Sequence, residues 1–191
     1  MKKFFGLFFI SILVLCVNLQ IASAAATPTP TFRYNLTWDI RNIYYYTDSA
    51  AQSNYGTPIS NASHNWCYTG YGNSLYPATR TTNQSNAAID FHTYSKADGN
   101  NAKTELRIFG STTPQIANDN DWDWGRIMIN DYEIGNDSSY IQGVVAHEMG
   151  HVFGLDHNDT NPNSIMCSAW AGRAVNTVQK VDNDAFNLKH P

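Results

Sequence analysis

The sequence predicts one α+β domain preceded by an export signal. Three segments carry apolar residues at helical spacing, namely 59–66, 141–152 and 181–188. Four segments are rich in β-branched and aromatic residues, as strands are, namely 32–46, 87–94, 102–109 and 125–130. About 165 residues follow the signal, which is enough for one domain with a sizeable core and short for two.

The N-terminus has the features of a secretory signal peptide. After a positively charged start, Phe4 to Val17 is an apolar run that is short for a membrane span, and Ala22-Ser23-Ala24 is a cleavage site. Cleavage after Ala26 is the second choice, and an uncleaved membrane anchor is the alternative. We therefore expect a signal peptide at 1–24, one catalytic domain at 25–191, and a secreted, extracellular protein.

The charge balance argues against two classes of partner. The signal contains two of the 12 basic residues, so its removal changes the formal net charge from −4 to −6. A mildly acidic protein without a basic cluster is poorly suited to nucleic acid or to an anionic membrane. We expect neither partner after signal removal, and we expect a monomer.

The most specific motif is H-E-x-x-H-x-x-G-x-x-H, which begins at His147. His147 and His151 are four residues apart, so on a helix they reach one metal ion from the same face. Gly154 can adopt a positive φ, end the helix and bring His157 back as a third ligand. Three nitrogen ligands leave a tetrahedral position for water, which is typical of catalytic zinc, and Glu148 stands beside them to accept a proton from that water.

This motif and the Ser164-Ile165-Met166 sequence after it resemble the metzincin clan of zinc endopeptidases, in which a methionine turn lies below the metal. The Gly-Leu-Asp-His sequence at the third histidine is most similar to the matrixin branch, whose members are matrix-metalloproteinase-like. The resemblance implies a protein or peptide substrate and one catalytic Zn²⁺. It also implies roles for five residues: His147, His151 and His157 as ligands, Glu148 as general base, and Met166 as a support below the ligands.

The resemblance further implies a metzincin-like catalytic domain. Such a domain has a twisted, mostly parallel sheet with an antiparallel edge strand, an active-site helix, a methionine turn and a C-terminal helix. In metzincins the strand before the active-site helix lines the cleft and pairs with substrate. Here that strand would consist of Arg126, Ile127, Met128, Ile129 and Asn130. Segment 167–179 would wall the pocket for the side chain after the scissile bond.

The C-terminal helix is expected at Val181 to Leu188. Its buried face would include Val181, Ala185 and Leu188. Asp182 and Asp184 would lie in the first turn, where the helix dipole favours negative charge.

The sequence departs from animal matrixins at several points. It has no Pro-Arg-Cys-Gly-type segment, so a cysteine-switch pro-domain is not expected. The histidine- and aspartate-rich loop that holds a structural zinc and calcium is not recognisable. Ser168 stands where some other metzincins carry a tyrosine near the zinc.

A calcium site has only weak support. Asp119, Asp121 and Asp123 alternate like the start of a calcium loop, but Trp124 and Asn130 replace the glycine and glutamate that an EF-hand needs. A looser Ca²⁺ site and a solvated acidic turn both remain open.

Two cysteines, Cys67 and Cys167, follow the signal. In an oxidising compartment the simplest expectation is one disulfide between them, and two buried thiols are the alternative.

A second functional class has to be weighed beside the zinc-dependent endopeptidase. The chain could be a secreted zinc-binding effector or interaction module without general proteolysis. The glutamate at 148 favours the enzyme, because a structural zinc site has no need of a carboxylate there. A protease that acts on one partner protein alone is a third reading.

Overall fold

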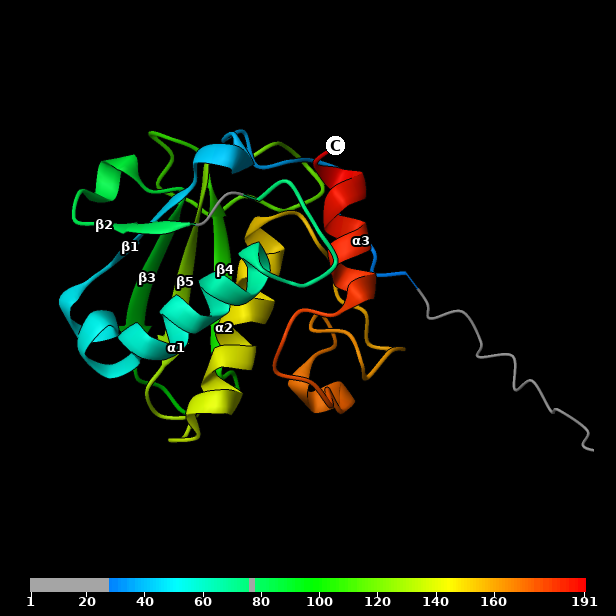
Figure 1. The fold of residues 1–191 in the computed structure, drawn as a ribbon. Helices are drawn as coiled ribbons and strands as arrows, with labels where there is room; N and C mark the ends of the chain where they lie inside the picture. Colours follow the sequence, from blue (N-terminus) through cyan, green and yellow to red (C-terminus); the bar gives the residue numbers. More distant parts are fainter. Residues whose placement is uncertain (1–27, 76–77) are drawn as a thin grey trace, which may run out of the picture.

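Five strands form one mixed sheet in the order β2-β1-β3-β5-β4 (Figure 1). The computed structural model describes residues 28–75 and 78–191, so the expected signal peptide lies outside the described residues. The strands are β1 Tyr44–Thr47, β2 Thr79–Thr81, β3 Ile89–Tyr94, β4 Ala102–Arg107 and β5 Trp124–Asn130. All neighbouring strands are parallel except β4, which runs antiparallel to β5 at the edge. The predicted α+β fold with a mostly parallel sheet and an antiparallel edge strand is confirmed.

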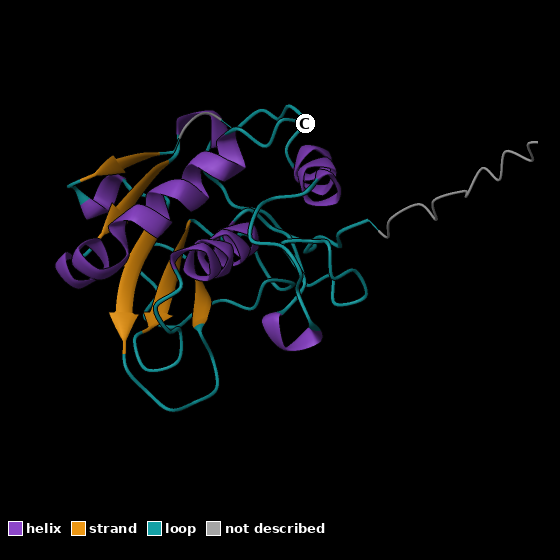
Figure 2. Ribbon diagram, turned by 60° about the horizontal axis from the view of Figure 1, so that its bottom comes forward, coloured by secondary structure: helices purple, strands orange, loops and turns teal. Residues whose placement is uncertain are grey.

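Two of the helices pack on the sheet. The α-helices are α1 Ser49–Cys67, α2 Ser138–Val152 and α3 Lys180–Lys189, and the short 3₁₀ helices are η1 Ile40–Asn42, η2 Gln84–Asn86 and η3 Ala169–Ala171. α1 and α2 lie against each other and against the strands, whereas α3 stands apart from the sheet (Figures 1 and 2). In the described part of the chain, no helix combines the length and apolarity needed to cross a membrane.

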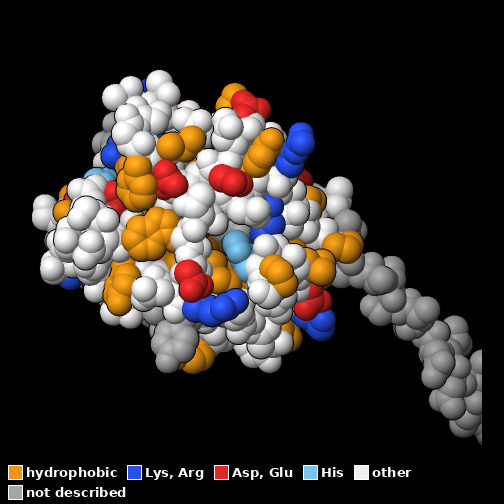
Figure 3. Space-filling view, turned by 90° about the horizontal axis from the view of Figure 1, so that it is seen from above, with side chains coloured by type: hydrophobic (Ala, Val, Ile, Leu, Met, Phe, Trp, Pro, Cys, Tyr) orange, Lys and Arg blue, Asp and Glu red, His pale blue; other side chains and the backbone are white. Residues whose placement is uncertain are grey.

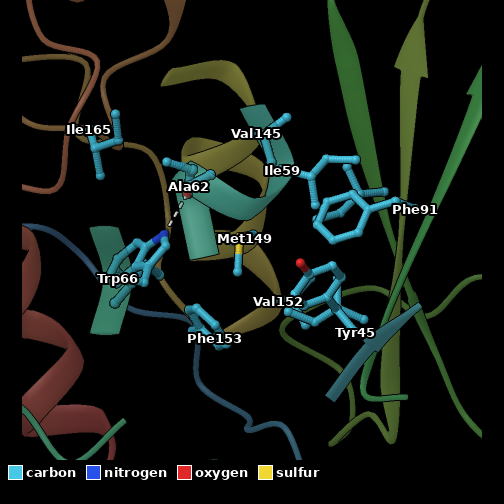
Figure 4. Packing of buried hydrophobic residues seen from close by; sticks show 14 of the residues in the cluster. Tyr45, Ile59, Ala62, Trp66, Phe91, Val145, Met149, Val152, Phe153 and Ile165 are labelled. Carbon is cyan, nitrogen blue, oxygen red and sulfur yellow. Dashed lines mark hydrogen bonds between the residues drawn. The ribbon is translucent and has the colours of Figure 1, made fainter. Parts of the chain in front are cut away.

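The core joins α1 to α2. Ile59, Ala62 and Trp66, whose spacing predicted a helix, have no exposed surface. The indole N–H of Trp66 donates to the carbonyl oxygen of Ala146 at 2.8 Å, and its ring packs edge-on against Phe153 (Figure 4). Truncating a buried tryptophan costs about 3–5 kcal/mol. α2 is therefore held firmly at the point where the histidine motif begins.

Segment 32–46 was expected to contain one or two strands, and the structure has one. That strand is Tyr44–Thr47. The 3₁₀ helix η1 precedes it, and before η1 residues 32–39 form a strap along the loop at 118–123. Side chains of that loop accept hydrogen bonds from the strap, as in Arg33 N to Asn118 Oδ1 and Asn35 N to Asp121 Oδ1, both at 2.8 Å. Backbone hydrogen bonds also join the strap to the loop, from Thr37 N to the carbonyl oxygen of Trp122 and from Trp122 N to that of Asn35. The contacts form one isolated bridge at Leu36 and Trp122 and not a continuous strand, which a pattern of β-forming residues does not reveal.

The same hydrogen bonds bear on the calcium question. Asp123 accepts from the Thr37 hydroxyl at 2.9 Å and from the amide N–H of Phe109 at 2.8 Å. Two of the three alternating carboxylates therefore fasten other segments of the fold. Among residues 28–75 and 78–191, three His, Cys, Asp or Glu side chains converge at one place, which is the cluster of His147, His151 and His157 and not this loop. These hydrogen bonds give the acidic loop a structural role.

α3 buries Ala185 as predicted, but the rest of its inner face differs from the prediction. Leu188 is 82% exposed, whereas Asp182, Asn183 and Phe186 are fully buried. The side-chain amide of Asn183 donates to the carbonyl oxygen of Gly72 at 3.0 Å. The helix packs on polar loops as well as on the core, so apolar spacing alone does not identify its inner face.

The predicted disulfide between Cys67 and Cys167 is wrong, because the structure has no bond between them. The Cys67 thiol lies beside the backbone of Ala78, and the Cys167 thiol donates to the carbonyl oxygen of Ser168 at 3.6 Å. The two side chains face different neighbours. Burial raises the pKa of both thiols, which keeps them protonated and poorly reactive.

Candidate active site

Helix α2 is anchored at both ends. Asp137 caps its N-terminus by accepting hydrogen bonds from the amide groups of Ser139 and Tyr140, at 2.9 and 3.2 Å. At its C-terminus, the carbonyl oxygen of Val152 accepts from the indole N–H of Trp122 at 2.9 Å. Ten of its 15 residues are buried. A helix enclosed in this way presents its side chains with little freedom.

The first two histidines of the motif are oriented by carbonyl groups. Nδ1 of His147 lies 2.8 Å from the carbonyl oxygen of Ile165, and Nδ1 of His151 lies 2.9 Å from that of Leu155. A carbonyl only accepts, so each Nδ1 carries the hydrogen and each Nε2 keeps its lone pair. The two Nε2 atoms lie 3.1 Å apart. Both lone pairs are thus available at one point.

The third histidine arrives through a sharp turn. Gly154 has φ +91°, and a Cβ there would lie 2.8 Å from Cε of Lys189. The following residue, Leu155, donates its N–H to the carbonyl oxygen of Gly150 at 2.9 Å, which ends the helix and reverses the chain. Ligand atoms of His147, His151 and His157 then lie within 4.8 Å of one another. The turn is the one that the motif predicted.

The three histidines suit a zinc ion. Burial lowers the pKa of each, and the charge of His151 lowers those of His147 and His157 further. Neutral imidazoles are the form that binds metal. Nitrogens on a tetrahedral zinc lie roughly 3.3 Å apart, close to the separation between His147 and His151.

The methionine turn lies directly below α2, as predicted. Met166 is fully buried, and a Cβ at Gly150 would clash with its Sδ atom. The amide of Asn158 donates to the carbonyl oxygen of Met166 at 2.9 Å, which joins the turn to the loop just after His157. Glycine at 150 thus permits the close contact between the turn and the helix.

A buried carboxylate from α3 holds this turn. Asp182 is fully buried and accepts from the Thr29 hydroxyl at 2.7 Å, from the Ile165 amide at 2.8 Å and from the Ser164 hydroxyl. Ile165 also supplies the carbonyl that orients His147. Asp182 therefore acts on the histidine cluster through the methionine turn, a role far from the helix-dipole effect expected for it.

We expect Asp182→Ala to destabilise the protein, because it leaves several buried donors unpaired. The free energy of unfolding should fall by about 3 kcal/mol and Tm by about 6–12 °C, measured by calorimetry. Asp184→Ala on the same helix is the control. Asp184 pairs with Lys180 on the surface at 2.6 Å, and its loss should cost under about 0.5 kcal/mol. Equal effects of the two changes would contradict this role.

Glu148 stands at the cluster with its carboxylate fixed by β4. The hydroxyl of Thr104 donates to Oε2 of Glu148 at 2.6 Å. Burial raises the pKa of Glu148, while this hydrogen bond acts in the opposite direction. Glu148 and the three histidines line a cleft of about 750 Å³ between α2, β4 and the segment that follows the methionine turn.

The prediction for the cleft strand was wrong in its choice of strand. Residues Arg126 to Asn130 belong to β5, which pairs with β3 on one side and β4 on the other. No residue of β5 lines the cleft, whereas Ala102 to Leu106 of β4 do. The strand closest in sequence to α2 has both edges occupied, so the free edge belongs to β4.

Sequence reasoning missed several residues of the site. Thr104 and Asp182 act through contacts between distant segments, and nothing in the local pattern marks them. Phe32, in the strap, stacks on His151 with ring centroids 5.9 Å apart. The polar composition of β4 was the one available signal, because polar residues are common on edge strands.

Comparisons with known proteins agree with this geometry. The family model described as Matrixin matches residues 30–189. No curated protein sequence matches the chain. A solved structure titled "GM1 bound form of the ECX AB5 holotoxin" is 15% identical, with a TM-score of 0.54 over 85% of this chain and 87% of that chain, and shows that the two share a fold.

A second solved structure is high choriolytic enzyme 1, a hatching enzyme zinc-protease from Oryzias latipes (Medaka fish). It is 18% identical, with a TM-score of 0.35 over 62% of this chain and 46% of that chain. The family match spans most of the chain, including the histidine cluster, Glu148 and Met166. The chain therefore belongs to the matrixin family of zinc metalloendopeptidases.

Proposed function

We propose that this chain is an exported endopeptidase in which His147, His151 and His157 hold the catalytic zinc and Glu148 is the general base. The observation that carries the proposal is the position of the Glu148 carboxylate. It is buried beside the three converging histidines, and it faces a cleft bordered by the free edge of a sheet.

A bound zinc would supply a Lewis acid that polarises the scissile carbonyl and makes water a stronger acid. Glu148 would accept the proton of the attacking water and donate it to the leaving nitrogen. Its raised pKa suits both transfers, because the acid form is easier to reach than for an exposed glutamate. Thr104 holds Oε2, which leaves Oε1 to take the proton.

The edge strand β4 would bind the substrate backbone. β4 pairs only with β5 along its length, and on its outer side the carbonyl of Leu106 accepts from the amide of Gln115 at 2.7 Å. No other strand covers the stretch from Ala102 to Glu105 among the described residues. An extended peptide can add to such an edge through backbone hydrogen bonds.

Export is part of the proposal, supported by the signal-like N-terminus alone. The apolar run at Phe4–Val17 and the site Ala22-Ser23-Ala24 predict a mature N-terminus at Ala25. Expression in a host with a secretion pathway, followed by mass spectrometry of the medium, tests this. A product that stays in the cells with residues 1–24 attached would contradict it.

The enzymatic proposal is tested by zinc-dependent cleavage of a peptide library. We expect hydrolysis by the purified, zinc-loaded protein, loss of activity with a zinc chelator, and recovery when zinc is added back. Mass spectrometry of the products would map the scissile bonds. If the protein binds zinc but cleaves no peptide in a broad library and no casein, the proposal of general proteolysis fails and a binding module is favoured.

A further inference from the structure

Arg173 brings an unpaired positive charge to the wall of the cleft. Its side chain lines the cleft together with Tyr140, Val144 and His147. Its Nη2 atom is buried and has no hydrogen-bond partner among the described residues. No carboxylate oxygen of these residues lies within 4.0 Å of the guanidinium group. A buried cationic donor without an acceptor is costly for the fold alone.

A second unpaired group lies in the same segment. The hydroxyl oxygen of Ser168 is also buried, lines the same cleft and has no hydrogen-bond partner among the described residues. The amide of Arg173 donates to the carbonyl oxygen of Ser168 at 3.4 Å, so the two residues are joined across the turn that η3 forms. Buried polar atoms are normally satisfied, and two unsatisfied donors in one cleft indicate a ligand with acceptor oxygens.

The pair stands close to the reacting groups. Arg173 and Ser168 line the same cleft as His147 and Glu148. The guanidinium carbon lies 6.0 Å from the centre of the Tyr140 ring, so an aromatic face borders the charge on one side. A side chain bound here would belong to a substrate residue next to the scissile bond.

The rest of the surface does not supply this preference. The chain carries a formal net charge of −4, and acidic and basic side chains are interspersed on the face that Figure 3 shows. A negatively charged peptide gains no general attraction from such a surface. Selection of an acidic residue would therefore have to come from the cleft.

We propose that Arg173 and Ser168 bind a carboxylate of the substrate, so that the enzyme cleaves beside aspartate or glutamate. This proposal rests on the proposed endopeptidase function. Because both residues line the cleft with Glu148 and His147, the carboxylate would belong to a residue near the scissile bond. A guanidinium group matches a carboxylate with two parallel N–H···O bonds, and the Ser168 hydroxyl can donate a third.

The test compares peptides in which a side-chain carboxylate is replaced by the corresponding amide. A library cleaved by the zinc-loaded protein should show Asp or Glu beside the scissile bond, favoured over Asn or Gln by about ten- to a hundredfold in kcat/KM. Each peptide is tested with an amidated and with a free C-terminus. This comparison shows whether the cleft recognises an acidic side chain or the carboxylate at the end of the peptide. A preference that requires the free terminus would assign the pocket to the chain end instead.

Arg173→Gln should remove the preference while cleavage beside uncharged residues continues, and Arg173→Lys should keep part of it. Arg41→Gln, an exposed arginine outside the cleft, is the control. Circular dichroism checks that each variant folds. Unchanged selectivity in Arg173→Gln, or no acidic preference in the original protein, overturns the inference.

A binding measurement separates this inference from the proposed function. Fluorescence anisotropy of labelled Asp and Asn peptides with zinc-loaded Glu148→Gln reports recognition without hydrolysis. If the original protein cleaves nothing, the proposed function fails, yet tighter binding of the Asp peptide still supports the carboxylate site. Equal binding of the two peptides overturns it.

Discussion

Glu148→Gln is expected to reduce kcat/KM by about 10²–10⁴-fold while zinc still binds. The amide has nearly the same shape as the carboxylate, and its oxygen can still accept from the Thr104 hydroxyl. What the variant lacks is a group that takes a proton and returns it. Steady-state kinetics on a cleaved library peptide give the loss, and metal analysis of the purified variant gives the zinc content.

Glu133→Gln is the matched control for this change. Glu133 lies in the loop after β5, where it accepts from the Gly99 amide at 3.1 Å, and it is absent from the cleft wall. The Glu133→Gln variant should have the same kcat/KM as the original protein. If Glu148→Gln held zinc and kept near-normal turnover, Glu148 would not be the base and another proton acceptor in the cleft would have to be found.

The part of the site that the sequence predicted is the part fixed by local geometry. Helical spacing places His147 and His151 on one face whatever surrounds them, and the glycine at 154 can adopt the positive φ that the turn requires. The third histidine follows three residues after that glycine, whereas the methionine turn was predicted from the resemblance to metzincins. These predictions needed no knowledge of how distant segments pack.

The errors arose where the answer depends on distant pairing. β5 precedes α2 in sequence, but strand order in a sheet is not set by sequence order, and β4 is the strand at the edge. Composition carried a signal: Ile127 and Ile129 of β5 are fully buried, whereas Lys103 and Glu105 of β4 are charged. An edge strand is better identified by its polar residues than by its distance from the helix.

The disulfide predicted between Cys67 and Cys167 was wrong for a similar reason. An oxidising compartment favours pairing of two cysteines, but it does not bring their side chains to face each other. For Asp182, the sequence pattern underestimated the role of the residue. Its position in the first turn of α3 predicted a weak helix-dipole effect, and its hydrogen bonds to Ser164 and Ile165 give it a much larger role.

His157→Ala is expected to weaken zinc binding by at least about a hundredfold, more than the loss of a group that merely orients a ligand. His157 is the most exposed of the three histidines and lies on a loop. Its removal should therefore change the metal-free stability by less than about 0.5 kcal/mol. Competition titration with a coloured zinc chelator measures the affinity, and calorimetry measures the stability.

The zinc-dependent rise in Tm separates ligand loss from general damage. Zinc at about 100 times its Kd stabilises the native state by about 2.7 kcal/mol, which raises Tm by about 5–11 °C in a chain of this size. His157→Ala should lose this rise at the same zinc concentration, while His64→Ala, an exposed histidine on α1, should keep it. A full rise in His157→Ala would mean that two histidines suffice, and the cluster would then not be a three-ligand site.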